Sequence, residues 1–212
     1  MMRIFLVLLL AWGATAPSWA APGPVLVLGD SLSAAYGIDR KRGWVALLKE
    51  RLQDRQPPLE AVNAAISGDT TRGGLARLPD LLERHQPSVL IVELGGNDGL
   101  RGIAPAEMQA NLERMVRLAR DAGARVLLAG VRLPPNYGPA FTEMFAQAFE
   151  AAAEATGAAF VSRILAGVAE RPELMQDDGI HPTAQAQPSI VDNVWPKLVP
   201  LLPDGRAASR EG

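Results

Sequence analysis

Five short, mostly apolar segments alternate along this chain with stretches in which apolar residues recur at helical spacing. Strands buried on both faces of a parallel sheet read as continuous apolar runs of this length, and crossover helices separate them. The alternation therefore predicts an α/β domain of three layers, with helices on both faces of a parallel sheet and right-handed connections. The predicted strands cover residues 25–28, 60–64, 89–94, 125–131 and 158–161.

Two of the intervening segments have well-defined apolar helix faces, and we expect these faces to pack against the core rather than to bind a ligand. Ligands of open α/β sheets bind beyond the carboxyl ends of the strands, so functional side chains are expected in the loops that follow strands. The two apolar faces are Trp44, Leu47, Leu48 and Leu52 in residues 44–53, and Met108, Leu112, Met115, Val116 and Ala119 in residues 107–122.

The composition is that of one globular domain. Of the 212 residues, 48% are hydrophobic and 21% are charged, which is enough to bury a full core. We assign the domain to residues 21–203 and a flexible tail to residues 204–212. A formal charge of −2 and the absence of a Lys/Arg block argue against a nucleic-acid partner. The chain has no cysteine and only two histidines, far apart in sequence, so no metal site is predicted.

The first 20 residues have the pattern of a secretory signal peptide. Arg3 precedes an unbroken apolar run at 4–11, and Ser18 and Ala20 stand three and one positions before the expected cleavage site. The alternative is an N-terminal membrane anchor, but the run is shorter than the about 20 residues that span a bilayer. No other segment could span a membrane. The mature protein is therefore expected to be exported, to the periplasm or the medium, without disulfides.

A serine after the first strand and an Asp-x-x-His sequence near the C-terminus predict a split catalytic triad. Ser31 lies in Gly29-Asp30-Ser31-Leu32-Ser33, and the later segment is Asp178-Gly179-Ile180-His181. A serine nucleophile needs a base near neutrality, which a third group orients. Of the two histidines, His85 ends a predicted helix and is interpreted as structural, which leaves His181 as the base. Asp178 is the orienting carboxylate, and Asp177 is interpreted as solvated or turn-capping.

Attack on a carbonyl also requires donors for the developing oxyanion, and three are predicted. The Asn97 side chain follows the third strand, and the Gly68 backbone N–H lies beyond the second. The third donor is the Ser31 backbone N–H, which we expect at the start of a helix. Capping offers an alternative at two of these places, with Asn97 or Asp98 as one N-cap and Asp69 or Thr70 as another.

Four blocks of the sequence resemble the signature blocks of the GDSL, or SGNH, hydrolases, and the resemblance covers nearly all of the chain after residue 20. It implies a flavodoxin-like sheet of five parallel strands. It also implies hydrolysis, without a cofactor, of aryl and alkyl esters, acyl-CoA thioesters and lysophospholipids. Ser31, Asp178 and His181 would form the triad, and the Ser31 N–H, the Gly68 N–H and Asn97 the oxyanion hole. The matching blocks are Gly29-Asp30-Ser31-Leu32, Gly68, Gly95-x-Asn97-Asp98 and Asp178-x-x-His181.

Two loops carry apolar residues that are candidates for an acyl-chain channel, although they are also typical of loops packed onto a domain edge. A carbohydrate esterase that removes acetyl groups is the alternative function, and it would need a more open and polar crevice. A non-catalytic exported lipid-binding domain is a second alternative. The Gly-x-Ser-x-Gly elbow of α/β-hydrolases and the common phosphate-binding glycine motifs are absent. The channel candidates are Leu100, Ile103, Leu133, Pro134, Tyr137 and Phe141.

Overall fold

Five parallel strands form the central sheet, in the order β2-β1-β3-β4-β5. The structure is a computed structural model and describes residues 22–203, so the predicted signal peptide and tail lie outside the described residues. The order is that of a doubly wound sheet, and it confirms the predicted five-stranded α/β fold. The strands are β1 (Val25–Gly29), β2 (Ala61–Asn63), β3 (Val89–Glu93), β4 (Arg125–Ala129) and β5 (Ala159–Val161).

The strands β1 and β3 form the centre of the core. They pair over five positions, from Val25 opposite Val89 to Gly29 opposite Glu93, and all ten residues are buried. Burial of apolar strands on both faces removes a large area from water, which is the main driving force for such a sheet. The polar residue Glu93 at the end of β3 is therefore an exception within an otherwise apolar pair of strands.

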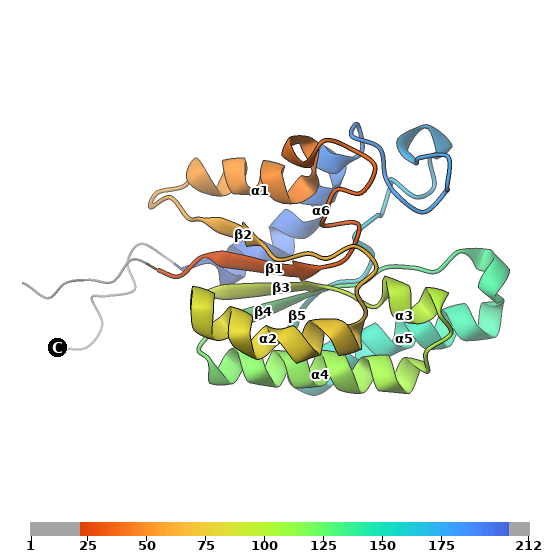
Figure 1. The fold of residues 1–212 in the computed structure, drawn as a ribbon, viewed down its shortest axis with the longest axis horizontal. Coiled ribbons are helices and arrows are strands. Elements are labelled where there is room, and N and C mark those ends of the chain that lie inside the picture. Colours follow the sequence, from red (N-terminus) through yellow and green to blue (C-terminus); the bar gives the residue numbers. More distant parts are fainter. Residues whose placement is uncertain (1–21, 204–212) are drawn as a thin grey trace, which may run out of the picture.

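Helices cover both faces of the sheet (Figure 1). On one face lie α1 (Trp44–Gln53) and α6 (Gln187–Leu198), which contact each other. On the other face lie α2 (Thr71–His85), α4 (Pro105–Asp121) and α5 (Pro139–Thr156), with α4 in contact with both neighbours. The short helix α3 (Gly96–Leu100) directly follows β3. The predicted three layers are thus present.

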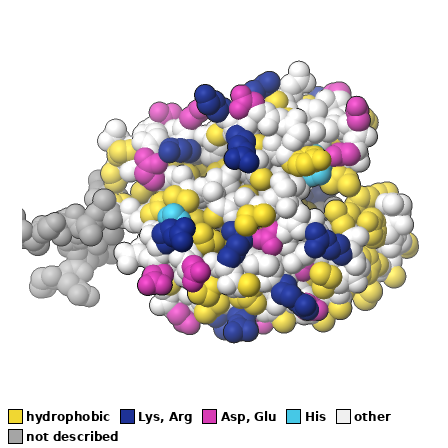
Figure 2. Space-filling view, in the orientation of Figure 1, with side chains coloured by type: hydrophobic (Ala, Val, Ile, Leu, Met, Phe, Trp, Pro, Cys, Tyr) yellow, Lys and Arg dark blue, Asp and Glu magenta, His cyan; other side chains and the backbone are white. Residues whose placement is uncertain are grey.

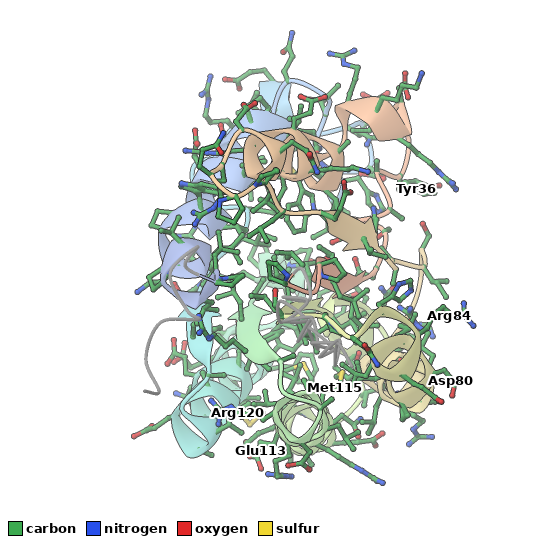
Figure 3. The ribbon with its side chains drawn as sticks, turned by 90° about the vertical axis from the view of Figure 1, so that its left-hand side faces the viewer. Tyr36, Asp80, Arg84, Glu113, Met115 and Arg120 are labelled. Atoms are coloured by element: carbon green, nitrogen blue, oxygen red, sulfur yellow. The ribbon has the colours of Figure 1, made fainter. Side chains whose placement is uncertain are left out.

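The amphipathic pattern of the helices is realised in the packing. All five apolar residues predicted for the inner face of α4 are buried, and Figure 3 shows Met115 among them directed into the molecule. In the same view Asp80 and Arg84 of α2 point away from the core, whereas Arg120 of α4 lies toward the end of α5, where it donates to the carbonyls of Thr156 and Gly157. Acidic and basic side chains are interspersed over the face in Figure 2 rather than separated into fields of one sign.

One local expectation is wrong, because no helix begins at Ser31. Residues 31–37 form successive turns instead, and the next regular element is the short 3-10 helix η1 (Arg40–Arg42). Ala35 has φ +58°, a left-handed conformation that a right-handed helix cannot contain. Among residues 22–203, no helix has the length and apolar character needed to cross a membrane.

Candidate active site

The loops that follow β1, β2 and β3 meet at the carboxyl edge of the sheet. β1 lies between the other two strands and runs parallel to both, so the three strands end side by side. Ser31 follows β1, Gly68 lies in the loop after β2, and Asn97 lies in α3 directly after β3. The fold therefore brings residues from three separate segments to one edge, as expected for an open α/β sheet.

A serine, a histidine and an aspartate form a hydrogen-bonded row at this edge. Nε2 of His181 lies 2.8 Å from Oγ of Ser31, and Nδ1 of His181 lies 2.6 Å from Oδ2 of Asp178. The side chain of His181 is 15% exposed and that of Asp178 is 39% exposed, so the row opens to solvent at the carboxylate. An imidazole between a hydroxyl and a carboxylate can accept the hydroxyl proton and is stabilised when charged.

The turn between Asp178 and His181 fixes these two side chains relative to each other. Oδ1 of Asp178 accepts hydrogen bonds from the backbone N–H groups of Ile180, over 2.9 Å, and His181, over 3.0 Å. Gly179 has φ +66°, which glycine adopts without steric cost. One carboxylate oxygen thus holds the turn while the other contacts the imidazole. The three-residue spacing between Asp178 and His181 allows both contacts at once.

These hydrogen bonds also set the charge of Asp178. Desolvation is the largest single influence on its pKa and raises it. The backbone N–H and side chain of His181 and the backbone N–H of Ile180 together outweigh desolvation and lower the pKa of Asp178 to about 2. Asp178 is therefore a carboxylate at neutral pH and can orient His181 and stabilise its charged form.

Gln176 and Tyr36 anchor the His181 loop, and neither was predicted from the sequence. The Gln176 side chain donates to the backbone carbonyls of Tyr36, over 2.9 Å, and Pro182, over 3.1 Å, while its backbone N–H donates to the carbonyl of His181 over 2.8 Å. The ring of Tyr36 lies against the imidazole, with centroids 4.5 Å apart. These contacts join the loop after β1 to the loop before α6, across 140 residues of sequence.

Asn97 and Gly68 have geometries that fit oxyanion donors. Nδ2 of Asn97 donates one hydrogen bond to Oδ2 of Asp30 over 2.9 Å, and an amide nitrogen has a second N–H to offer. Gly68 has φ +81°, and Nη2 of Arg101 donates to its carbonyl oxygen over 2.7 Å. Both groups are thus held by a neighbouring side chain, which is the preorganisation that oxyanion stabilisation requires.

Asp30 orients Asn97 from a buried position next to the serine. Its second oxygen accepts the backbone N–H of Leu32 over 3.1 Å, within the turn that presents Ser31. Burial is the main influence on its pKa, which rises to about 6, although the hydrogen bonds from Leu32 and Asn97 and the attraction of His181 oppose that rise. Above that pH, Asp30 is an anion that accepts both hydrogen bonds.

The capping alternatives have different outcomes at the two loops. The N-cap of α3 is Gly95, with φ +120°, so the alternative that Asn97 or Asp98 caps this helix is wrong. A Cβ at Gly95 would lie 2.7 Å from the Phe149 ring, so this turn packs directly on α5. In the loop after β2, Thr70 is the N-cap of α2, and its side chain accepts the N–H of Gly73 over 3.3 Å. The cap lies two residues after Gly68.

The buried carboxylate of Asp98 ties α3 to the start of α2. It accepts the backbone N–H of Thr71 over 2.8 Å and also the Thr71 hydroxyl, and Asn111 of α4 donates to that hydroxyl oxygen over 3.0 Å. Because Asp98 is adjacent to Asn97 and Thr71 lies three residues after Gly68, this contact fixes the two proposed oxyanion donors relative to each other.

His85 and Asp177 take no part in the hydrogen-bonded row of Ser31, His181 and Asp178. His85 is the last residue of α2, as predicted, and precedes the amino end of β3, at the opposite edge of the sheet from Ser31. Asp177 is exposed and lies beside Asp178 in the turn. The described residues contain no cluster of three or more side chains suited to hold a metal ion.

The two candidate acyl loops lie next to each other, since the Tyr137 hydroxyl donates to the backbone carbonyl of Leu100 over 3.3 Å. Leu133 is buried and packs against Gly99, where an added Cβ would lie 2.5 Å from Leu133 Cδ2, so Leu133 belongs to the core. Leu100 and Phe141 are half-buried against the core, and Ile103 and Pro134 are half-buried as well. Figure 2 shows apolar side chains gathered at the right-hand end of the molecule, where Figure 1 places the start of α5.

The chain is similar to known proteins both in sequence and in structure. The sequence model of the GDSL-like lipase/acylhydrolase family matches residues 27–187. Esterase TesA of Pseudomonas aeruginosa is 54% identical over 183 residues, which cover 86% of this chain and 91% of the relative. Thioesterase 1/protease 1/lysophospholipase L1 of Escherichia coli K12 is 43% identical, with 86% of both chains covered. A crystal structure of TesA superposes with a TM-score of 0.82 at 54% identity, covering 84% of this chain and 99% of that chain.

Proposed function

This chain belongs to the GDSL-like lipase/acylhydrolase family and is an ester hydrolase, and we propose that it acts through an acyl-enzyme formed on Ser31. The observation that carries the proposal is the position of His181 between Oγ of Ser31 and Oδ2 of Asp178, at 2.8 Å and 2.6 Å. A hydroxyl, a base and an orienting carboxylate in hydrogen-bond contact are the parts that nucleophilic acyl transfer requires.

In the first half of the reaction, Ser31 Oγ attacks the carbonyl carbon of the ester. With Nδ1 protonated and donating to Asp178, Nε2 of His181 is free to take the hydroxyl proton. The tetrahedral intermediate then collapses, the bond to the leaving alcohol breaks, and His181 returns the proton to that alcohol. The acyl group remains as an ester on Ser31.

In the second half, water replaces the alcohol. His181 takes a proton from a water molecule, whose oxygen attacks the acyl-enzyme, and the same imidazole returns the proton to Ser31 as the acid leaves. In both tetrahedral intermediates the negative oxygen accepts hydrogen bonds from the free N–H of Asn97 and from the backbone N–H groups of Gly68 and Ser31. No step requires a cofactor.

Replacing Asn97 with alanine should lower kcat by about 10²- to 10³-fold, since loss of one preorganised oxyanion donor has this cost. KM should change little, because the donor acts on the transition state rather than on the ground state. Steady-state kinetics on an aryl ester measure both constants. Gln147→Ala, which removes an exposed amide on α5, is the matched control and should retain wild-type kcat. Equal kcat in Asn97→Ala and wild type would remove Asn97 from the oxyanion hole.

Small-molecule esters are the substrates, and we propose that their acyl groups are long and apolar, from thioesters and lysophospholipids as well as simple esters. The relatives named thioesterase and lysophospholipase support this range. Exposed apolar side chains on the loops around the triad also support it: Tyr36 and Ile66 are each 53% exposed and Ile180 is 38% exposed. With the apolar loops that carry Leu100 and Phe141, they offer an apolar environment to an acyl chain.

Chain-length profiling on p-nitrophenyl esters tests this range. Each buried CH₂ contributes about 0.8 kcal/mol, so burial of only two of the roughly six additional CH₂ groups of an octanoyl ester should already raise kcat/KM about tenfold over an acetyl ester. Phe141→Ala should reduce kcat/KM for octanoyl esters more than for acetyl esters. A strong preference for acetyl would instead support the alternative, a carbohydrate esterase that removes acetyl groups.

We further propose that residues 1–20 direct export and are removed after Ala20, so that residues 21–203 act as one periplasmic or secreted catalytic domain. The charged start, apolar run and small residues before the cleavage position support this proposal. N-terminal sequencing of the protein from a cell envelope fraction tests it, with Ala21 expected as the first residue.

A further inference from the structure

A buried carboxyl group lies beneath the Ser31 turn, and the reaction proposed above does not use it. Glu93 ends β3, stands opposite Gly29 in the sheet register, and is 0% exposed. Its neighbours Asp30 and Ser33 are 3% and 1% exposed. Ionisable groups are seldom fully buried without an opposite charge, because desolvation of the charged form is costly.

Glu93 receives its hydrogen bonds from the segment that carries Ser31. The Ser33 hydroxyl donates to Oε2 of Glu93 over 2.7 Å, and the backbone N–H of Asp30 donates to the same oxygen over 3.4 Å. The other oxygen, Oε1, is buried and has no hydrogen-bond partner among residues 22–203. Glu93 forms no ion pair within that range either.

We propose that Glu93 is a positioning residue that works as a neutral carboxylic acid: it holds the Ser31 turn through Ser33 and the Asp30 N–H, while the negative charge stays on Asp30. This inference rests on the proposed role of Ser31. A neutral acid presents one carbonyl oxygen to two donors and leaves no unpaired charge in the core, whereas an ionised Glu93 would place a second anion beside Asp30.

The charges around Glu93 and Asp30 favour a neutral Glu93 beside an ionised Asp30. Burial raises the pKa of Glu93 well above its ordinary value, and the nearby charge of Asp30 raises it further, against the hydrogen bonds from Ser33 and the Asp30 N–H. His181, from the loop before α6, attracts the Asp30 carboxylate, while Asp69, from the loop after β2, repels it. With the charge on Asp30, its carboxylate accepts from Asn97 and keeps that amide oriented.

The position of Gly29 has a physical explanation in the same contacts. A Cβ added there would lie 2.5 Å from Oγ of Ser33 and 3.0 Å from Oε2 of Glu93. Any other side chain would therefore displace the hydrogen bond between Ser33 and Glu93, so the first glycine of the Ser31 segment makes room for it.

Two substitutions separate the positioning role from a merely structural one. Glu93→Gln keeps a carbonyl acceptor without an ionisable proton, so kcat and KM for an octanoyl ester at neutral pH should stay within a few-fold of wild type. Glu93→Leu removes the acceptor, and kcat should fall by about 10²-fold at unchanged KM, since misplacement of a reacting group by about 1 Å has this cost. Wild-type kcat in folded Glu93→Leu would overturn the positioning role.

The protonation state is tested without reference to activity. The infrared C=O band of a protonated carboxylic acid at about pH 8, where Asp30 is ionised, should be present in wild type and in the surface control Glu83→Gln and should be absent in Glu93→Gln. An unchanged band in Glu93→Gln would overturn the neutral-acid assignment. Because this result does not depend on Ser31, it distinguishes failure of this inference from failure of the proposed reaction.

Stability gives a second readout. A proton held by folded Glu93 but released by the unfolded chain makes wild-type stability fall as pH rises above the ordinary glutamate pKa. Glu93→Gln lacks this loss, so its Tm relative to wild type should rise as the pH increases above the ordinary glutamate pKa. Glu83→Gln should show no such trend. A Tm difference independent of pH would contradict a neutral Glu93.

Discussion

Replacing Ser31 with alanine should lower kcat for ester hydrolysis by about 10⁴-fold or more, because removal of a triad nucleophile leaves only the activity of the remaining site. The change removes one hydroxyl, whose hydrogen-bond contact is with Nε2 of His181 at 2.8 Å. Ser31 is half-buried at the sheet edge and is not part of the apolar core, so the variant should unfold at nearly the wild-type temperature.

The matched control for this prediction is Ser189→Ala. Ser189 is an exposed serine on α6, and its replacement by a good helix former should alter neither kcat nor Tm measurably. Kinetics and thermal unfolding of both variants separate loss of chemistry from loss of fold. Substantial turnover by purified Ser31→Ala would exclude Ser31 as the nucleophile.

Replacing His181 with alanine should have an effect of similar size, about 10⁴-fold or more in kcat, since the base and nucleophile act as a unit. Ser31 would then lack an acceptor for its proton, and Asp178 would lose the imidazole that it orients. His85→Ala is the internal control, because His85 ends α2 at the opposite edge of the sheet and should be dispensable for activity.

The pair of histidine variants also tests the choice between the two residues. Steady-state kinetics should give an inactive His181→Ala and an active His85→Ala. The reverse pattern would overturn the assignment of the base. The double variant Ser31→Ala/His181→Ala should be no less active than either single variant, because each already removes the same reaction path.

The fold followed from the sequence because its determinants are local and repeated. Apolar runs of strand length alternate with helical spacing, and the only sheet that buries them on both faces is parallel with helices on either side. The strand ends differ from the predicted ones by up to two residues, as at Ala129 against the predicted residue 131. Helix and strand termini depend on tertiary contacts that periodicity does not encode.

The candidate site followed from the sequence in part. The parallel topology requires loops after neighbouring strands to converge, which is why Ser31, Gly68 and Asn97 were expected together. The small number of histidines reduced the choice of base to two. The helix expected at Ser31 is absent because Ala35 adopts a left-handed backbone conformation. Residues other than glycine rarely adopt this conformation, so the sequence does not indicate it.

The supporting contacts were beyond sequence reasoning because they are long-range and chemically ordinary. Gln176 reaches the carbonyl of Tyr36 across 140 residues, and Ser33 reaches Glu93 across 60. A glutamine in a loop or a serine in a turn has many possible partners, and only the three-dimensional arrangement selects one. Glu93 was the one available signal, as a single acid at the end of an otherwise apolar strand.

Ser31 is the residue proposed to become acylated, and covalent labelling tests this role most directly. A fluorophosphonate that mimics the tetrahedral intermediate should inactivate the enzyme with one adduct per chain. Peptide mass spectrometry should place that adduct on Ser31, with no labelling of Ser31→Ala and full labelling of Ser189→Ala. An inactivating adduct on any other residue would contradict the assignment of Ser31 as the nucleophile.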